Sequence, residues 1–316
     1  MRGIICSITP NPALDLSGFV EALKVDEKTY VHQEVRAPGG NGINSARILN
    51  RLGVSVVASG FLGGSTGKEI ELLLKGEHLR HHFIPIRESS RINITVTNQS
   101  NHKQTRLSFP GPRVDRDEKR QLFNYIKGNK ELCLLILGGS LPPGFTTKDF
   151  RSLIAIAKKN NVEVVVDCPG GILSQVISSK PLLIKPNLDE FQVLTGTKVR
   201  SIFAVRAQAE KYLNKVPYIC VSSVDGGALL VTPVGAYFGR IPEVRILSTV
   251  GAGDSMVGSM VAQLYKGNRS PEQILRWGLA AAAATLSESG TRLGRASHIK
   301  KLFKRTVVES VSRQRR

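Results

Sequence analysis

Short apolar runs alternate with longer helical stretches along nearly the whole chain, and this alternation limits the fold more than any other feature. Runs rich in β-branched and aliphatic residues predict strands at residues 4–8, 54–59, 133–137, 162–167, 182–184, 218–221 and 228–231. Apolar residues at helical spacing predict helices at residues 42–52, 66–74, 117–126, 147–160, 188–194, 202–213, 252–265 and 271–287. Such alternation is typical of an α/β fold, in which helices cover both faces of a mostly parallel sheet. The 316 residues suffice for one large domain of this kind.

Two stretches, at approximately residues 16–38 and 85–110, depart from this alternation. Polar and apolar residues there alternate with a period of two, as in the Asn-Ile-Thr-Val-Thr sequence of residues 93–97. This period predicts antiparallel strands outside the main sheet. Because ligands of open α/β sheets bind beyond the carboxyl ends of the strands, we interpret both stretches as a small β lid over that edge, within a single domain of residues 1–316.

The glycine-rich sequence Ser-Thr-Val-Gly-Ala-Gly-Asp-Ser-Met at residues 248–256 is the strongest candidate for chemistry. Gly251, Ala252 and Gly253 lead directly into a predicted helix, whose first N–H groups attract an anion. Glycine is required where a Cβ would block the approach of phosphate oxygens. Asp254 could there accept the proton of an attacking hydroxyl. The same residues also fit a tight turn in which Asp254 is an ordinary N-cap.

A second glycine cluster, Pro-Gly-Gly-Asn-Gly-Ile-Asn at residues 38–44, also leads into a predicted helix. Gly39 and Gly40 would let a sugar lie against the backbone, and Asn44 could bond its hydroxyl groups. A plain loop fits the same residues.

The sequence Lys-Pro-Asn-Leu-Asp-Glu at residues 185–190 follows an apolar strand. Lys185 and Asn187 could meet phosphate oxygens, and Glu190 could hold Mg²⁺ through water. The spacing of Asn187 and Glu190 also fits a capping box at the start of a helix. Asp15 and Ser140 each follow a predicted strand as well, where a loop and a site are both compatible with the sequence.

The net charge of +19 favours an anionic ligand, either a nucleic acid or a small anionic substrate. Residues 291–316 hold nine Lys or Arg and one Glu, a net of +8. That segment lacks the aromatic interleaving that stacks bases, so we interpret it as a solvated helix and tail. No apolar run reaches the roughly 18 residues of a membrane span, and residues 1–6 predict a first strand in place of a signal peptide. We therefore expect a cytoplasmic protein with no membrane partner.

The segments at residues 38–47, 139–144, 185–190 and 249–254 occur together in the order and spacing of the PfkB, or ribokinase-like, family of carbohydrate kinases, which the chain resembles over nearly its whole length. The sequence Asn-Pro-Ala-Leu-Asp at residues 11–15 is similar to the branch that acts on sugar phosphates, namely minor 6-phosphofructokinase, 1-phosphofructokinase and tagatose-6-phosphate kinase. Residues 248–258 and 290–293 resemble the minor 6-phosphofructokinases in particular. The resemblance implies a three-layer sandwich with a β lid, and a homodimer through the lid strands.

The resemblance also implies roles for single residues. Asp254 would be the catalytic base, with Gly251, Ala252 and Gly253 as the anion hole. The other implied site residues are Asp15, Gly39, Gly40 and Asn44 for the sugar, Lys28, Arg91 and Ser140 for its phosphate, Lys185, Asn187, Ser222 and Gly227 for the nucleotide, and Glu190 for Mg²⁺. The implied cofactors are Mg²⁺ with ATP and a monovalent cation such as K⁺, with carbonyl ligands near Ser248 and Val250.

We therefore expect a kinase that uses ATP to convert fructose 6-phosphate into fructose 1,6-bisphosphate. Activity as a 1-phosphofructokinase or a tagatose-6-phosphate kinase is an alternative, because Tyr30 stands where the minor 6-phosphofructokinases tend to carry a basic residue. A remote alternative is a basic nucleic-acid-binding protein on a kinase scaffold. The intact Gly-Ala-Gly-Asp sequence disfavours it, so we expect no specific nucleic acid among the partners.

Overall fold

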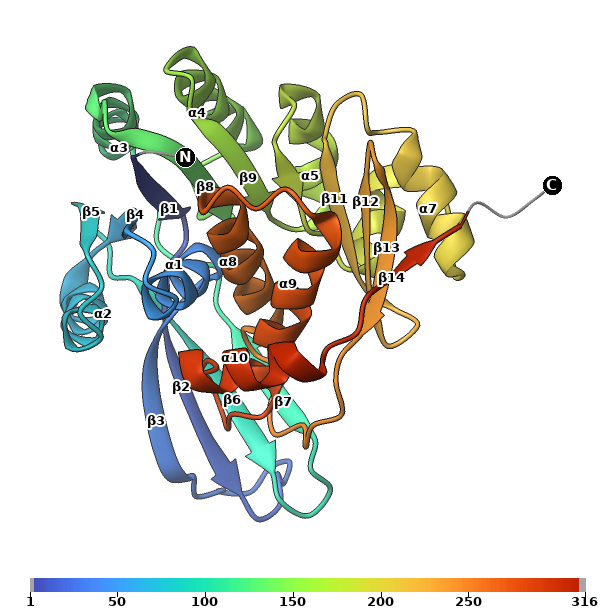
Figure 1. Cartoon of the computed structure of the whole chain (residues 1–316). Coiled ribbons are helices and arrows are strands. Elements are labelled where there is room, and N and C mark those ends of the chain that lie inside the picture. The colour runs from blue at the N-terminus through green and yellow to red at the C-terminus, as the bar shows by residue number, and fades with distance from the viewer. Residues whose placement is uncertain (1–2, 313–316) are drawn as a thin grey trace.

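The computed structural model describes residues 3–312, and within them ten strands form one sheet. Their bounds are Ile4–Thr9 (β1), Val56–Leu62 (β4), His81–Pro85 (β5), Leu132–Gly138 (β8), Glu163–Asp167 (β9), Leu183–Ile184 (β10), Tyr218–Val224 (β11), Gly227–Thr232 (β12), Gly235–Arg240 (β13) and Glu309–Val311 (β14). The strand order is β14-β13-β12-β11-β10-β9-β8-β1-β4-β5 (Figure 1). Neighbouring strands from β5 to β11 are parallel, and those from β11 to β14 are antiparallel. The predicted mostly parallel sheet is confirmed.

Helices cover both faces of this sheet (Figure 1). They span Asn41–Arg51 (α1), Gly64–Gly76 (α2), Arg116–Gly128 (α3), Thr147–Lys159 (α4), Gly170–Val176 (α5), Leu188–Thr195 (α6), Ile202–Glu210 (α7), Ala252–Tyr265 (α8), Pro271–Leu286 (α9) and Ala296–Arg305 (α10). Helices α3 to α7 pack on one face, in a core that includes Cys6 and Leu135. Helices α1, α2, α8 and α9 pack on the other face, around Ile5 and Leu134. Successive strand residues therefore serve opposite cores, as the pleat requires.

A second sheet, which we call the lid sheet, projects from the carboxyl edge of the main sheet (Figure 1). Its strands are Ala13–Val20 (β2), His32–Gly39 (β3), Arg91–Asn98 (β6) and Gln104–Ser108 (β7), in the order β3-β2-β6-β7. These strands overlap the two stretches that depart from the alternation. However, β2 and β6 are parallel, so the expectation of antiparallel strands throughout is wrong. Both strands follow a strand of the parallel main sheet, β1 or β5, and so leave that edge in the same direction.

Some element boundaries differ from the prediction for identifiable reasons. The helix predicted at residues 202–213 ends at Glu210, and turns follow up to Pro217, which disfavours helical backbone before it. Helix α5 was not predicted because it begins with Gly170 and Gly171, which are poor helix formers. Strand β5 was not predicted because its first two residues are histidines, which interrupt the apolar run.

No helix within residues 3–312 combines the length and the apolar character that crossing a membrane would need. The helix expected in the basic C-terminal segment is confirmed as α10, which exposes Lys300, Lys301, Lys304 and Arg305. The last four residues of the expected solvated tail, 313–316, and residues 1–2 of the expected first strand lie outside the described part of the chain.

Candidate active site

The glycine turn at the start of α8 is shaped for an anion. Gly251 is the N-cap residue and has a φ of 75°, which glycine adopts without strain. No side chain in the described part of the chain caps this helix end, so the alternative in which Asp254 is an ordinary N-cap is wrong. The first N–H groups of a helix lack acceptors within the helix, so those of Ala252 and Gly253 are open to a negatively charged ligand.

Asp254 lies in the first turn of α8 and is held from α1. The Nδ2 atom of Asn44 donates to Oδ2 of Asp254 at 2.8 Å, and Oγ of Ser45 donates to the Asp254 backbone oxygen at 3.0 Å. Burial raises the pKa of Asp254 to about 7, and the charge of Asp167 adds to this effect. A carboxyl group with such a pKa can accept a proton at neutral pH.

Lys185 and Asp167 form a buried ion pair next to the glycine turn. The Nζ atom of Lys185 lies 3.3 Å from Oδ1 of Asp167, and a Cβ placed on Gly253 would be 3.1 Å from the same Nζ. Burial acts to lower the pKa of Lys185, but the charges of Asp167, Asp254 and other acidic neighbours together outweigh it, so the pKa is raised and the ammonium group persists. Asp167 was not among the predicted site residues, and its one signal in the sequence is its place at the end of an apolar strand.

Asn187 and Glu190 open α6 as a capping box. The Oδ1 atom of Asn187 accepts from the Glu190 N–H at 2.9 Å, and Oε2 of Glu190 accepts from the Asn187 N–H at 2.8 Å, which confirms the capping interpretation. Ser222 forms a bridge with Asn187 and so lies beside this segment. A Cβ on Gly227 would be 2.1 Å from the carbonyl oxygen of Gly239, so packing against β13 already explains this glycine.

The carboxylates beside Lys185 fit a Mg²⁺ ion that arrives with a nucleotide. Burial raises the pKa of Glu190, and the charge of Asp167 contributes in the same direction. Mg²⁺ usually keeps several waters and binds one or two carboxylates together with phosphate oxygens. Asp167 and Glu190 fit that pattern. Within residues 3–312 no three His, Cys, Asp or Glu side chains gather as a complete protein-only metal site.

Polar residues from the lid sheet and α1 also lie near Asp254. A Cβ on Gly39 would lie 2.1 Å from Oδ2 of Asp15, so only glycine leaves room for this carboxyl group. Asn93 donates through Nδ2 to Oδ1 of Asp15 at 3.0 Å. Burial raises the pKa of Asp15 to about 6. Gly40 is the N-cap of α1, the helix that carries Asn44, so these predicted sugar-binding residues are adjacent.

Arg91 and Ser140 also lie together, at the base of the lid sheet. The Nη2 atom of Arg91 donates to Oγ of Ser140 at 3.4 Å and to the carbonyl oxygen of Asn11 at 3.0 Å. Nε of Arg91 and Oδ1 of Asn11 are buried without a hydrogen-bond partner among the described residues. The three side chains line a hollow of about 590 Å³. Asn11 was given no role of its own from the sequence, although it opens the Asn-Pro-Ala-Leu-Asp sequence of residues 11–15.

Lys28 does not join Arg91 and Ser140. It lies exposed in the loop between β2 and β3, with Nζ 4.8 Å from the centre of the Tyr30 ring. Arg91 pairs with Ala13 at the first residue of β2, whereas this loop begins after Val20, about 20 Å further along the strand. The expectation that both cations meet one anion is therefore wrong within a single chain.

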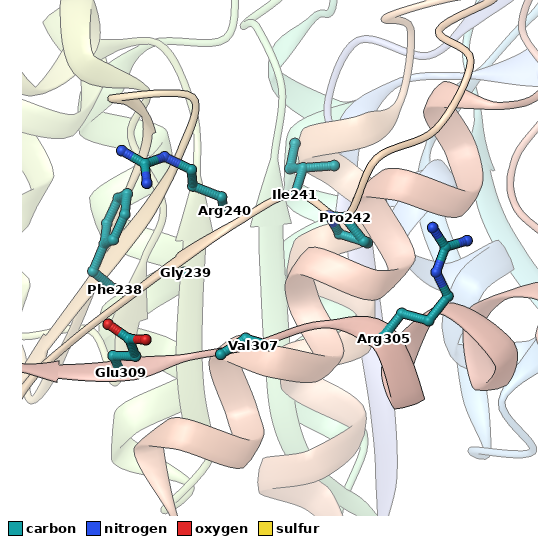
Figure 2. A pocket seen from close by; sticks show the side chains of 8 residues that line it. All are labelled: Phe238, Gly239, Arg240, Ile241, Pro242, Arg305, Val307 and Glu309. Carbon is teal, nitrogen blue, oxygen red and sulfur yellow. The ribbon is translucent and has the colours of Figure 1, made fainter.

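A separate hollow of about 280 Å³ lies between β13, β14 and the end of α10 (Figure 2). None of the candidate site residues lines it. Its two guanidinium groups have protein partners, since Arg240 pairs with Asp225 at 2.5 Å and Arg305 donates to the carbonyl oxygen of Glu243 at 3.3 Å. The candidate catalytic residues lie elsewhere, at the carboxyl edge of the sheet.

Three characterised relatives resemble the chain over most of its length. It is 34% identical over 292 residues to the ATP-dependent 6-phosphofructokinase isozyme 2 of Escherichia coli, which covers 92% of this chain and 94% of that protein. It is 29% identical to the 1-phosphofructokinase of Bacillus subtilis, with coverages of 89% and 92%. It is 30% identical to the tagatose-6-phosphate kinase of Staphylococcus epidermidis, with coverages of 86% and 89%.

Crystal structures of phosphofructokinase-2 from Escherichia coli share this fold. The complex with substrates and products has a TM-score of 0.91 at 31% identity, and covers 96% of this chain and 99% of that chain. The complex with potassium and the tetrameric inhibited form match over the same shares, with TM-scores of 0.90 and 0.88 at 32% and 31% identity. The predicted ribokinase-like sandwich with a small β lid is confirmed. The model of the pfkB family of carbohydrate kinases matches residues 11–297. The chain therefore belongs to the pfkB family of carbohydrate kinases, which makes it a phosphotransferase.

Proposed function

We propose that this kinase transfers a phosphoryl group from ATP to a hydroxyl group of a ketohexose phosphate, with fructose 6-phosphate as acceptor and fructose 1,6-bisphosphate as product. One observation carries the proposal. Asp254, with a pKa of about 7, stands in the first turn of α8, bonded to Asn44 and close to the turn that Lys185 approaches. A poised base beside open N–H groups and a cation is what phosphoryl transfer onto a hydroxyl needs.

In the proposed phosphoryl transfer, each group around Asp254 has a separate role. Asp254 accepts the proton of the attacking hydroxyl. The N–H groups of Ala252 and Gly253, together with Lys185, stabilise the charge of the transferred phosphoryl group. Asp15 and Asn44, with Gly39 and Gly40 behind them, orient the sugar. The lid sheet restricts water at the site and so limits hydrolysis of ATP.

The nucleotide side is proposed to hold Mg²⁺ with ATP. Glu190 and Asp167 would bind the ion, directly or through water, and Asn187 and Ser222 would face the nucleotide. The ion would supply charge neutralisation at the phosphates. A monovalent cation at carbonyl oxygens of Ser248 and Val250 is also proposed, and the crystal structure of the Escherichia coli relative with potassium supports it.

The phosphate of the acceptor is proposed to bind at Arg91, Ser140 and Asn11. A guanidinium group offers forked donors that suit phosphate oxygens. The buried, unpartnered Nε of Arg91 and Oδ1 of Asn11 indicate that a polar ligand completes this group. An unphosphorylated sugar would bring no phosphate group to bind the guanidinium group of Arg91.

The acceptor can be identified with a coupled assay of ADP release. Fructose 6-phosphate, fructose 1-phosphate and tagatose 6-phosphate are compared with fructose, ribose and adenosine. We expect the highest kcat/KM with fructose 6-phosphate and negligible turnover of the unphosphorylated compounds. Preference for another ketose phosphate would correct the acceptor alone, whereas efficient turnover of fructose or adenosine would contradict the sugar-phosphate assignment.

A homodimer through the lid sheet is also proposed. Leu16, Ile94 and Leu107 stand opposite one another on three adjacent strands, and Leu107 is 52% exposed. Such an apolar sheet face favours a second layer. The Escherichia coli relative has been solved in a tetrameric inhibited form, which supports assembly in this family. In such a dimer the loop of Lys28 is free to approach the site of the other subunit.

A further inference from the structure

The side-chain amide of Asn44 is fixed from both ends. Its Nδ2 atom donates to Oδ2 of Asp254 at 2.8 Å, and its Oδ1 atom accepts from Nη1 of Arg47 at 3.3 Å. A guanidinium group can only donate, so Arg47 requires the amide oxygen on its own side. The NH₂ group must then point at Asp254. Without Arg47, the amide could turn and present its oxygen to the carboxylate.

Arg47 is buried, with 4% of its surface exposed, and every part of its guanidinium group is engaged. Nε donates to both carboxylate oxygens of Glu77 at 3.0 and 2.9 Å, and Nη2 donates to Oε1 of Glu77 at 2.5 Å. Nη1 serves Asn44 and also the carbonyl oxygen of Pro38 at 3.3 Å. The guanidinium group of Arg47 therefore contacts both Pro38, which precedes Gly39, and Asn44, which is the hydrogen-bond partner of Asp254. A lysine has one nitrogen and cannot span these positions.

Glu77 is the C-cap residue of α2 and also receives a second arginine. Nη2 of Arg51, one helical turn after Arg47, lies 3.5 Å from Oε2 of Glu77. Nη1 of Arg51 donates to the carbonyl oxygens of Leu293 and Gly294 at 2.6 and 3.1 Å. A Cβ on Gly251 would be 2.5 Å from Cδ2 of Leu293. Arg51 therefore contacts a residue that packs directly behind the proposed anion hole.

We propose that Arg47 is a positioning residue for Asp254, acting through Asn44, and that Glu77 holds Arg47 in place for this role. The carboxylate of Glu77 neutralises a buried guanidinium group and sets its plane, and that plane sets the Asn44 amide. The inference rests on the proposed role of Asp254 as base. It extends the site to two residues whose hydrogen-bonded connection to Asp254 runs through Asn44.

The first test compares Glu77→Gln and Arg47→Lys with the wild type. We expect kcat with the preferred sugar phosphate to fall at least tenfold in each variant, because the base loses its fixed donor, while KM for ATP stays within twofold. Glu69→Gln is the matched control, since Glu69 lies on the same helix and pairs with the exposed Arg36; its kcat should be unchanged. Circular dichroism and thermal melting confirm that each variant is folded. The two test variants alter opposite partners, so either folded variant suffices for the test.

A double-mutant cycle separates positioning from general destabilisation. In an Asn44→Ala background, Glu77→Gln should change kcat less than twofold, because the path from Glu77 to Asp254 is already cut. Unchanged kcat in folded Glu77→Gln or Arg47→Lys would overturn the proposal, and so would a full tenfold loss in the Asn44→Ala background. The Asp254→Asn variant distinguishes a failure of the proposed catalytic base from a failure of the positioning role. A silent Asp254→Asn variant would refute the base itself, whereas an inactive one with silent Glu77 and Arg47 variants would refute only the positioning role.

Discussion

Asp15 and Asp254 are two buried carboxyl groups whose charged forms the fold disfavours. Burial raises the pKa of Asp15 to about 6 and that of Asp254 to about 7. Because the folded-state pKa exceeds the unfolded one, these groups stabilise the fold most when protonated, and that contribution is lost as the pH rises through the folded-state values. A base that is ready to accept a proton at neutral pH is thus a carboxylate that the fold partly disfavours.

Activity should follow the ionisation of Asp254. We expect kcat/KM to rise about tenfold per pH unit below about pH 7 and to level off above it, because only the carboxylate form can accept the proton. Conversely, the contribution of Asp254 to thermal stability should decrease between about pH 4 and pH 7, and Asp254→Asn should remove that decrease. Rate profiles and melting curves over pH 5–9 measure both effects. A rate profile that is flat from pH 5 to pH 8 would contradict the role of Asp254.

The residues that sequence analysis could name stand in local motifs at the carboxyl edge of the sheet. Asp254 and Lys185 belong to such motifs, and the structure brings them close to the same glycine turn. Asp167 ends a strand without a motif, although it pairs with Lys185. Arg47 has the spacing of an ordinary helical residue, and its partner Glu77 is the C-cap residue of another helix, α2. Contacts between distant elements leave no short pattern, which is why these residues were not found.

Among the elements, the lid sheet carries residues of the proposed acceptor site. Strand β2 carries Asp15, and β6 begins with Arg91 and continues with Asn93. The parallel pairing of β2 with β6 places Asp15 opposite Asn93, and Arg91 two residues nearer the main sheet. The sugar end and the phosphate end of an acceptor would therefore lie along one pair of strands.

Arg91→Ala should raise KM for the sugar phosphate at least tenfold, which corresponds to about 1.4 kcal/mol of lost binding. The reason is that the guanidinium group at the base of β6 would no longer neutralise the phosphate. KM for ATP should stay within twofold, because the nucleotide side is formed by other elements. Arg87→Ala is a suitable control, since the Arg87 side chain is 89% exposed. An unchanged KM in the Arg91 variant would show that Arg91 only supports the lid.

Element types were more predictable than their pairing. Helix α8 has the predicted bounds of Ala252–Tyr265, because a glycine turn marks its start and its apolar spacing is regular. The period-two pattern correctly indicated strands in the lid. It contains no information on which strands pair, and β2 and β6 are separated by the whole unit from β3 to β5. Their parallel direction follows from the main sheet they leave, which only the complete fold shows.

At the scale of the whole molecule, the net charge of +19 suits the anionic ligands that are proposed here. Part of this charge lies on the exposed face of α10. Phe303 of that helix stacks on Trp277, with ring centres 4.4 Å apart, and so is engaged within the protein. The net positive charge therefore suits the proposed anionic ligands, whereas α10 presents no row of free aromatic rings on which bases could stack.

The apolar face of the lid sheet leads to a prediction about assembly. Ile94 lies between Leu16 and Leu107 in the middle of that face, so Ile94→Glu would place a charge at the centre of the proposed dimer interface, where burial without a partner is costly. We expect sedimentation velocity to show a dimer for the wild type and a monomer for the variant. If the loop of Lys28 serves the other subunit, KM for the sugar phosphate should rise as well. Val234→Glu is the control, since Val234 is 75% exposed on the distant turn after β12, and it should remain dimeric. A wild type that is monomeric at assay concentrations, with full activity, would contradict the lid dimer and leave the catalytic assignment to stand on Asp254 within a single chain.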